Sequence, residues 1–271
     1  MNKLQKIFGK EKDIVIGAIH FPPLLGYPEF PGLDIALNNA LIDLRAFEEG
    51  GVDGIIIENN YDIPHVEQVS QDVINCMIFL GEKIVSATRL PVGISVLWND
   101  YRTALSIASS IGLKFIRVPV FVDTVETSYG IMKGDSKKVT DFRASIKATD
   151  VALFTDIHVK HAKLLSTMTI TESAKKAIEE DSDGLILTGR WTGEAPELEK
   201  LKQVKDVVGD FPILCGSGID ATNIKDLFVY ANGAIVSTSL KEGINIKNEV
   251  NVKPYSQRID KNKVIDLINN L

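Results

Sequence analysis

The sequence has few cysteines, no excess of basic charge and no long apolar run, and each absence argues against a class of protein. Its two cysteines, Cys76 and Cys215, lie in apolar segments without metal-site spacing, so we interpret them as reduced core thiols. The formal net charge of −6 argues against a nucleic-acid-binding protein, which needs a basic surface. No segment approaches the roughly 18 apolar residues of a transmembrane helix, and the stretch MNKLQKIFGKEKD lacks the apolar core of a secretory signal. We therefore expect a cytoplasmic protein, with peripheral membrane attachment left open.

The composition is that of a globular protein, because 45% of the 271 residues are hydrophobic and 24% are charged. This length accommodates one α/β barrel or two smaller domains. Apolar strand-like segments recur along the chain at residues 13–20, 54–59, 91–98, 115–120, 151–158, 184–189, 212–218 and 233–239. They are apolar almost throughout rather than alternating, which is typical of parallel strands covered on both faces.

Helical patterns separate these segments, for example at residues 33–51 and 171–184. The second, fourth, sixth and eighth segments each follow a helix end and a small or turn-forming pair, which indicates a repeat of two βα units. We therefore predict an α/β fold, a single (β/α)8 TIM barrel domain over residues 1–271, with an open doubly wound sheet as the alternative. Two long loops, residues 21–32 and 121–134, follow predicted strands one and four and are interpreted as rims or lids of a site.

The segment FTDIHVKH, residues 154–161, places an acid, two imidazoles and an amine at the end of the fifth predicted strand. Side chains alternate in extended backbone, so Asp156, His158 and Lys160 are expected on one side, with His161 on the other in a structural role. An acid can orient an imidazole, and an ammonium can stabilise developing negative charge. The alternative is a polar strand end with structural hydrogen bonds only.

Other predicted strand ends supply further polar residues. Arg117 lies within an apolar strand, where a guanidinium is unfavourable unless it meets a substrate anion or forms a salt bridge with Glu58 or Asp156. Trp191 could stack on a ligand or pack on its own loop. We assign catalytic roles to Asp156, His158, Lys160, His20, Glu58 and Arg117, and substrate contacts to Asn59, Asn99, Thr188 and Gly189.

No cofactor is identified, but a divalent metal stays open. Imidazole and carboxylate ligands from separate strand ends, namely His20, Glu58, Asp156 and His158, make an open site for such an ion, although their spacing is not diagnostic. Schiff-base chemistry has less support, because Lys160 lies just past its strand and no other lysine belongs to a predicted strand.

The two last predicted strands are followed by loops suited to phosphate. The first carries Gly216, Ser217 and Gly218 and leads into a helix expected near Ala221, and the second carries Ser237 and Thr238. Exposed backbone N–H groups and a helix N-terminus favour a phosphate dianion, and barrels repeatedly bind phosphate at these loops. The alternative is a glycine pair that only makes a tight turn.

The segments IHFPPLLGYP, GGVDGIIIEN, TDIHVKHA, LTGRWTGEAP and CGSGI together resemble the BtpA/SgcQ family along nearly the whole chain. The resemblance implies a barrel of the ribulose-phosphate-binding kind, in a family described partly as photosystem I biogenesis proteins and partly by association with sugar-utilisation genes. The family pattern usually has a proline where this chain reads Leu24-Leu25-Gly26, which bears on the rigidity of that loop. By position the resemblance points to His20, Glu58, Asn59, Asp156, His158, Lys160, His161, Thr188, Gly189 and residues 216–218.

Two classes of function follow. We favour an enzyme of isomerase or lyase type, acting by acid–base chemistry on a small phosphorylated, sugar-like metabolite at the carboxyl end of the barrel. The alternatives are a non-enzymatic assembly or stability factor for a membrane protein complex, and a metal-dependent hydrolase or lyase. An assembly factor should expose an apolar patch or a basic amphipathic surface, and the sequence marks neither clearly. A homo-oligomer stays open.

Overall fold

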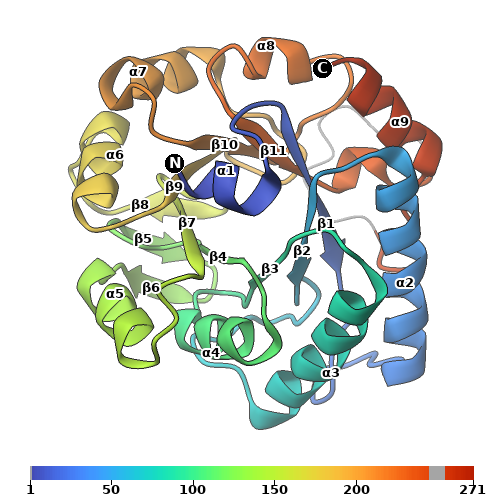
Figure 1. The fold of residues 1–271 in the computed structure, drawn as a ribbon. Coiled ribbons are helices and arrows are strands. Elements are labelled where there is room, and N and C mark those ends of the chain that lie inside the picture. Colours follow the sequence, from blue (N-terminus) through green and yellow to red (C-terminus); the bar gives the residue numbers. More distant parts are fainter. Residues whose placement is uncertain (1, 244–253) are drawn as a thin grey trace.

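The computed structural model describes residues 2–243 and 254–271. Within these ranges parallel strands close into a barrel in the order β1-β11-β10-β9-β7-β4-β3-β2 (Figure 1). The barrel strands are β1 (Ile14–His20), β2 (Gly54–Glu58), β3 (Val92–Ser95), β4 (Phe115–Val118), β7 (Ala152–Asp156), β9 (Gly184–Thr188), β10 (Ile213–Gly216) and β11 (Gly233–Val236). Each falls inside a segment that the sequence predicts as a strand, and the predicted (β/α)8 barrel is confirmed.

Helices form a ring around the strands, with α1 lying across the barrel axis (Figure 1). They are α1 (Lys3–Phe8), α2 (Leu33–Gly50), α3 (Gln71–Ala87), α4 (Tyr101–Ile111), α5 (Ser136–Ser145), α6 (Ile170–Glu179), α7 (Leu198–Val208), α8 (Ile224–Leu227), the 3₁₀ turn η1 (Thr238–Leu240) and α9 (Lys261–Asn269). Local sequence sets several of their ends: Thr169 and Glu172 form a capping box before α6, and Gly51 ends α2 with a φ of 92°. None of the helices in the described ranges combines the length and the apolar character needed to cross a bilayer.

The core has two layers that meet at the strands. Side chains such as Ile16, Phe115 and Phe154 fill the inside of the barrel, while a larger layer packs between the strands and the surrounding helices. Helix α1 closes the amino end of the barrel with Leu4, and Phe8 packs on Phe115 with ring centroids 5.8 Å apart. Apolar side chains therefore fill the barrel toward the amino ends of the strands, and polar side chains gather at the carboxyl ends.

The predicted long loop at residues 121–134 contains regular structure. Strands β5 (Thr124–Thr127) and β6 (Gly130–Lys133) form a hairpin, and β8 (Ala162–Leu164) joins it in an antiparallel sheet. Along β5 Val125 and Thr127 are buried, whereas Thr124 is half-buried and Glu126 is exposed, because only one face of this small sheet packs on the barrel. Its buried face contacts Trp98 and Val159, so the hairpin forms one wall of the barrel mouth.

Candidate active site

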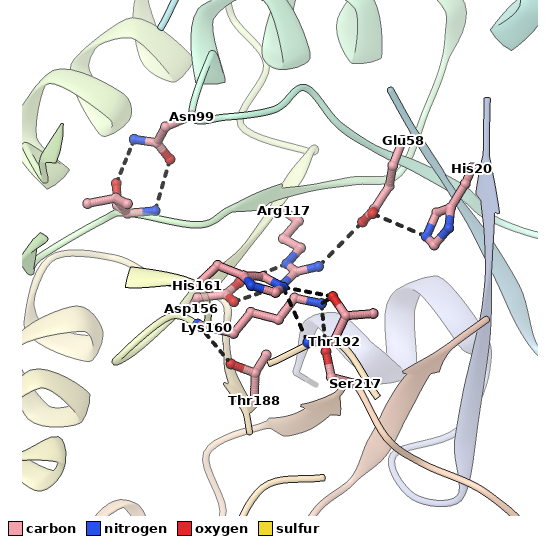
Figure 2. Close-up of polar contacts among 11 residues, drawn as sticks. His20, Glu58, Asn99, Arg117, Asp156, Lys160, His161, Thr188, Thr192 and Ser217 are labelled. Carbon is pink, nitrogen blue, oxygen red and sulfur yellow. Dashed lines mark hydrogen bonds and ion pairs between the residues drawn. The ribbon is translucent and has the colours of Figure 1, made fainter. Parts of the chain in front are cut away.

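A buried ion-pair network holds Arg117 at the centre of the barrel mouth (Figure 2). Its Nε and Nη2 atoms each donate to one carboxylate oxygen of Asp156 at 2.8 Å, and Nη1 lies 3.4 Å from Glu58 Oε1. Burial alone lowers the pKa of Arg117, but the two carboxylates outweigh it and raise the pKa overall. The salt-bridge alternative is therefore realised with both acids, and three of the five guanidinium N–H donors are engaged.

His20 stands beside Glu58 on the neighbouring strand. Strands β1 and β2 pair these residues in register, and His20 Nε2 lies 3.6 Å from Glu58 Oε2. Burial, reinforced by Lys241, Lys160 and Arg117, holds the pKa of His20 well below its usual value, so its imidazole is neutral near pH 7. Its Nδ1 atom is buried and has no hydrogen-bond partner among the described residues. The ring is thus able to exchange a proton with a ligand.

Lys160 reaches across the mouth from the loop after β7. Its Nζ donates to Ser217 Oγ at 2.6 Å and to Thr192 Oγ1 at 3.3 Å, while its backbone N–H donates to Thr188 Oγ1. Burial and the nearby Arg117 lower the pKa of Lys160 to about 8. An ammonium with this pKa can neutralise a bound anion and also release its proton near neutral pH.

The expected grouping of Asp156 with His158 is wrong. Strand β7 ends at Asp156, and His158 has a φ of 50°, so the extended backbone on which the alternation rests does not continue. The backbone N–H of His158 donates to Asp123 Oδ2, and its ring lines an outer cavity between the β5–β6–β8 sheet and the loop after β9. Asp156 therefore orients Arg117, and His158 does not join the network.

His161 also leaves the extended path, with a φ of 58°. Its Nε2 lies 2.8 Å from Thr192 Oγ1, and its ring packs edge-on against Trp191 at a centroid distance of 5.3 Å. Burial, together with the charge of Lys160, lowers the pKa of His161 to about 4. The neutral imidazole of His161 thus contacts Thr192, whose hydroxyl oxygen also accepts a hydrogen bond from the Lys160 ammonium.

The four expected metal ligands do not come together. His158 lies outside the mouth, and both carboxylate oxygens of Asp156 are held by Arg117. In residues 2–243 and 254–271, no group of three or more His, Cys, Asp or Glu side chains is arranged to hold a metal ion. The metal-dependent mechanism built on His20, Glu58, Asp156 and His158 is therefore withdrawn.

The two predicted phosphate loops line one cavity with His20, Glu58, Arg117 and Lys160. Ser217 and Gly218 have φ values of 70° and 63°, and the Ser237 Oγ is buried without a partner in the described part of the chain. The expected helix near Ala221 is wrong, since α8 begins at Ile224. The cavity is therefore lined by the loop backbone, by hydroxyl groups and by Lys160, and not by the start of that helix.

Glycines of the mouth also serve packing. A Cβ added at Gly218 would lie 2.2 Å from the backbone N of Ala195, and one at Gly189 would lie 2.2 Å from the carbonyl oxygen of Glu194. Gly218 thus lets the loop after β10 pack closely on residues 193–195, and Gly189 lets the loop at residues 189–195 fold back on itself. This contact sets the position of Thr192 above Lys160.

Two predicted substrate contacts are occupied by loop bonds. Asn59 donates to Asp62 at 3.0 Å and accepts from the Leu97 backbone at 2.7 Å, while Asn99 bonds both backbone groups of Val120 at 2.9 Å (Figure 2). Both asparagines hold loops in place. The sequence reasoning missed Asn60 and Thr192, which line the mouth. Alternation beyond Glu58 indicates Asn60, whereas no local pattern indicates Thr192.

Comparison with known proteins places the chain among relatives of similar length. A sequence model of the BtpA family matches residues 11–264. The photosystem I biogenesis protein BtpA of Synechocystis sp. is 38% identical over 239 residues, covering 87% of this chain and 83% of that protein. An uncharacterized protein of Pyrococcus furiosus is 36% identical, covering 89% and 92%.

Solved structures with the same fold have low sequence identity to the chain. N-(5'-phosphoribosyl)anthranilate isomerase from Pyrococcus furiosus superposes with a TM-score of 0.55 at 12% identity, covering 95% of this chain and 98% of that one. Tryptophan synthase from M. tuberculosis superposes with a TM-score of 0.60 at 16% identity, covering 100% and 98%. At such identities the likeness shows the barrel fold alone.

Proposed function

The chain belongs to the BtpA family, and we propose that this member is an enzyme acting by general acid–base chemistry on a small phosphorylated, sugar-like metabolite. One observation carries the proposal. A single cavity at the carboxyl end of the barrel is lined on one side by His20, Glu58, Arg117 and Lys160, and on the other by the loops at residues 216–218 and 237–239. Acid–base groups and an anion-binding wall thus face the same small volume.

The phosphate group lies against the loops after β10 and β11. The backbone N–H groups of Ser217, Gly218 and Thr238 have no acceptor within the described residues, and the buried Ser237 hydroxyl also lacks one. Successive free N–H groups beside positive-φ residues form a concave anion site. The Lys160 ammonium, held 2.6 Å from Ser217 Oγ, supplies the positive charge.

The reacting carbons lie nearer to β1, β2 and β4. A base removes a proton from the carbon beside a carbonyl, and the electrons of the broken C–H bond pass to the carbonyl oxygen to give an enediolate. Neutral His20 is suited to take and return that proton, with Glu58 beside it stabilising the imidazolium. Arg117 has two N–H donors that meet no acceptor among the described residues and are available for the oxyanion, and Asp156 fixes its orientation. Isomerase and lyase reactions share this step.

Ligand binding is the first test of the proposal. Inorganic phosphate, glycerol 3-phosphate and ribose 5-phosphate are each added in thermal unfolding, where a ligand at 100 times its Kd stabilises the fold by about 2.7 kcal/mol. We expect stabilisation by at least one phosphate ester, and a weaker effect in Ser237→Ala. If no phosphate compound stabilises the protein, the proposal is wrong.

Proton exchange is the second test. Candidate ketose and aldose phosphates are incubated with the protein in deuterated water, and deuterium at the carbon beside the carbonyl is followed by NMR. We expect His20→Gln to abolish the exchange while ligand binding remains, because the variant removes the proton carrier and keeps the phosphate wall. Exchange at the wild-type rate in this variant would remove His20 from the mechanism.

A second candidate function has one specific observation in its favour. The 38% identical relative carries the name photosystem I biogenesis protein, so a role in assembly or stability of a membrane protein complex is the alternative. Capture of such a complex by the wild type and equally by His20→Gln, without binding of any phosphate ester, would favour assembly over catalysis. Loss of exchange with retained ester binding favours the enzyme.

A further inference from the structure

A second cavity of about 240 Å³, which we call the side cavity, opens beside the cavity proposed to bind the phosphate group. The two cavities share part of their lining, namely Glu58, Asn60, Arg117, Lys160 and Thr192. The shared residues include the acid, the guanidinium and the ammonium to which chemistry is assigned above. A single molecule can therefore place its phosphate in one cavity, another group in the side cavity, and its reacting atoms between them.

The part of the side cavity that is not shared with the first cavity is mainly apolar and aromatic. Leu97 and Trp98 come from the loop after β3, Pro119 from the end of β4, and Val159 from the loop after β7. Trp98 and Val159 also belong to the apolar cluster beneath the β5–β6 hairpin, so both are held rigidly by packing. A polyhydroxylated group placed here would lose hydrogen bonds to water without replacing most of them.

The rings of Tyr129 and His65 also line the side cavity, together with Ser128 and His161. Tyr129, in the turn of the hairpin, packs edge-on against His65 at a centroid distance of 5.3 Å and an angle of 77°. Burial lowers the pKa of His65 to about 4, so its ring is neutral. His65 Nδ1 and Asn60 Nδ2 are buried without partners in the described part of the chain. Such walls suit a flat uncharged ring that carries hydrogen-bonding atoms on its edge.

We propose that the side cavity binds an aromatic or heteroaromatic ring of the same substrate whose phosphate lies against residues 216–218 and 237–238. The substrate class is then a sugar phosphate that carries an uncharged planar ring at the end opposite the phosphate. This inference rests on the proposed function. The atoms that join the ring to the sugar lie beside Glu58, Arg117 and Lys160, which is where the proton transfers take place.

Calorimetric titration separates the two parts of the ligand. The probes are ribose 5-phosphate, adenosine, and ring-bearing ribose phosphates, namely adenosine, inosine and uridine 5'-monophosphate and benzimidazole riboside 5'-phosphate. We expect at least one ring-bearing phosphate to bind ten or more times tighter than ribose 5-phosphate. If ribose 5-phosphate binds and no ring-bearing compound binds tighter, the ring inference is wrong while the proposed function stands. If none of the phosphates binds, both are wrong.

Variants of the hairpin locate the ring. Tyr129→Ala should weaken the tightest ring-bearing ligand roughly two- to twelvefold, as expected for an aromatic contact of about 0.5 to 1.5 kcal/mol, and should leave ribose 5-phosphate unchanged. Ile131→Ala is the matched control, since Ile131 lies on the same hairpin, is 67% exposed and does not line the side cavity. Ser237→Ala should weaken both ligands. Equal effects of the two hairpin variants on the ring-bearing ligand would overturn the assignment.

Discussion

Replacing Asp156 with asparagine tests the ion-pair network most directly. The asparagine side chain would keep the shape of the aspartate but present an amide NH₂ to a guanidinium that is itself only a donor. Asp156 is 1% exposed and Arg117 is 8% exposed, so water cannot replace the lost carboxylate oxygen. The remaining contact of Arg117 is the longer one, 3.4 Å to Glu58. The variant therefore leaves a buried charge without adequate compensation.

The expected loss is large relative to the stability of a folded domain. Removing one partner of a buried, hydrogen-bonded ion pair typically costs about 3 to 5 kcal/mol, against total unfolding free energies of roughly 5 to 15 kcal/mol. For a chain of this size that corresponds to a fall in Tm on the order of 10 °C. Both 2.8 Å bonds to Asp156 are charge-assisted, which places the expected loss at the upper end of the range.

The assay is urea unfolding at pH 7 with a constant m value. Asp141→Asn is the control, since its ion pair with Lys137 is at least 64% exposed on both sides and should contribute little to stability. The triple variant Arg117→Met, Asp156→Leu, Glu58→Gln should recover much of the loss, because it removes the guanidinium together with both carboxylates that it pairs with. A loss below about 1 kcal/mol for Asp156→Asn, or no recovery in the triple variant, would refute the reasoning.

Further predictions concern Lys160, His158 and Gly218. Because the pKa of Lys160 falls from 10.5 to about 8 on folding, affinity for inorganic phosphate should drop as pH rises through 8, and Lys160→Gln, titrated calorimetrically, should remove that dependence. The same lowered pKa predicts that wild-type unfolding free energy rises relative to this variant between pH 8 and 10.5, where the unfolded chain binds more protons. His158→Ala should leave phosphate-ester binding and proton exchange unchanged, because His158 lies outside the mouth. If His158→Ala lost as much proton exchange as His20→Gln, that placement of His158 would be contradicted. Gly218→Ala should unfold at lower urea than Gly112→Ala, which meets nothing within 4 Å and carries only the left-handed backbone strain of about 1 to 2 kcal/mol; equal midpoints would count against the tight loop contact.

The barrel could be predicted because its signals are local and repeated. Each strand is an apolar segment of a few residues, and several helices begin or end at a capping residue such as Thr169 or Gly51. Their places at the ends of predicted strands, or within one, also identified His20, Glu58 and Arg117, which line one cavity at the mouth. What alternation cannot give is the point where the extended backbone stops.

The prediction for residues 154–161 failed at that point. His158 and His161 both adopt left-handed backbone, which few side chains other than Gly, Asn and Asp favour. Long-range contacts select these conformations, since the N–H groups of the two histidines donate to Asp123 and to the carbonyl of Arg190. Those partners lie 35 and 29 residues away, so no local pattern in FTDIHVKH contains the information. Lys160, which lies between the left-handed residues His158 and His161, nonetheless lines the mouth as expected.

The distribution of unpaired polar atoms favours catalysis over a purely structural barrel. Strands β1, β2 and β3 pair His20 with Glu58 and Glu58 with Ser95, which sets these side chains in one row at the mouth. His20 Nδ1, Ser95 Oγ and the Ser237 Oγ just beyond β11 are buried without partners among the described residues. Each such group destabilises the fold by about 1 to 3 kcal/mol relative to a satisfied one, and apolar side chains would avoid that loss. A ligand that hydrogen-bonds His20 and Ser237, which both line the cavity at the mouth, explains why the barrel keeps these two polar groups there.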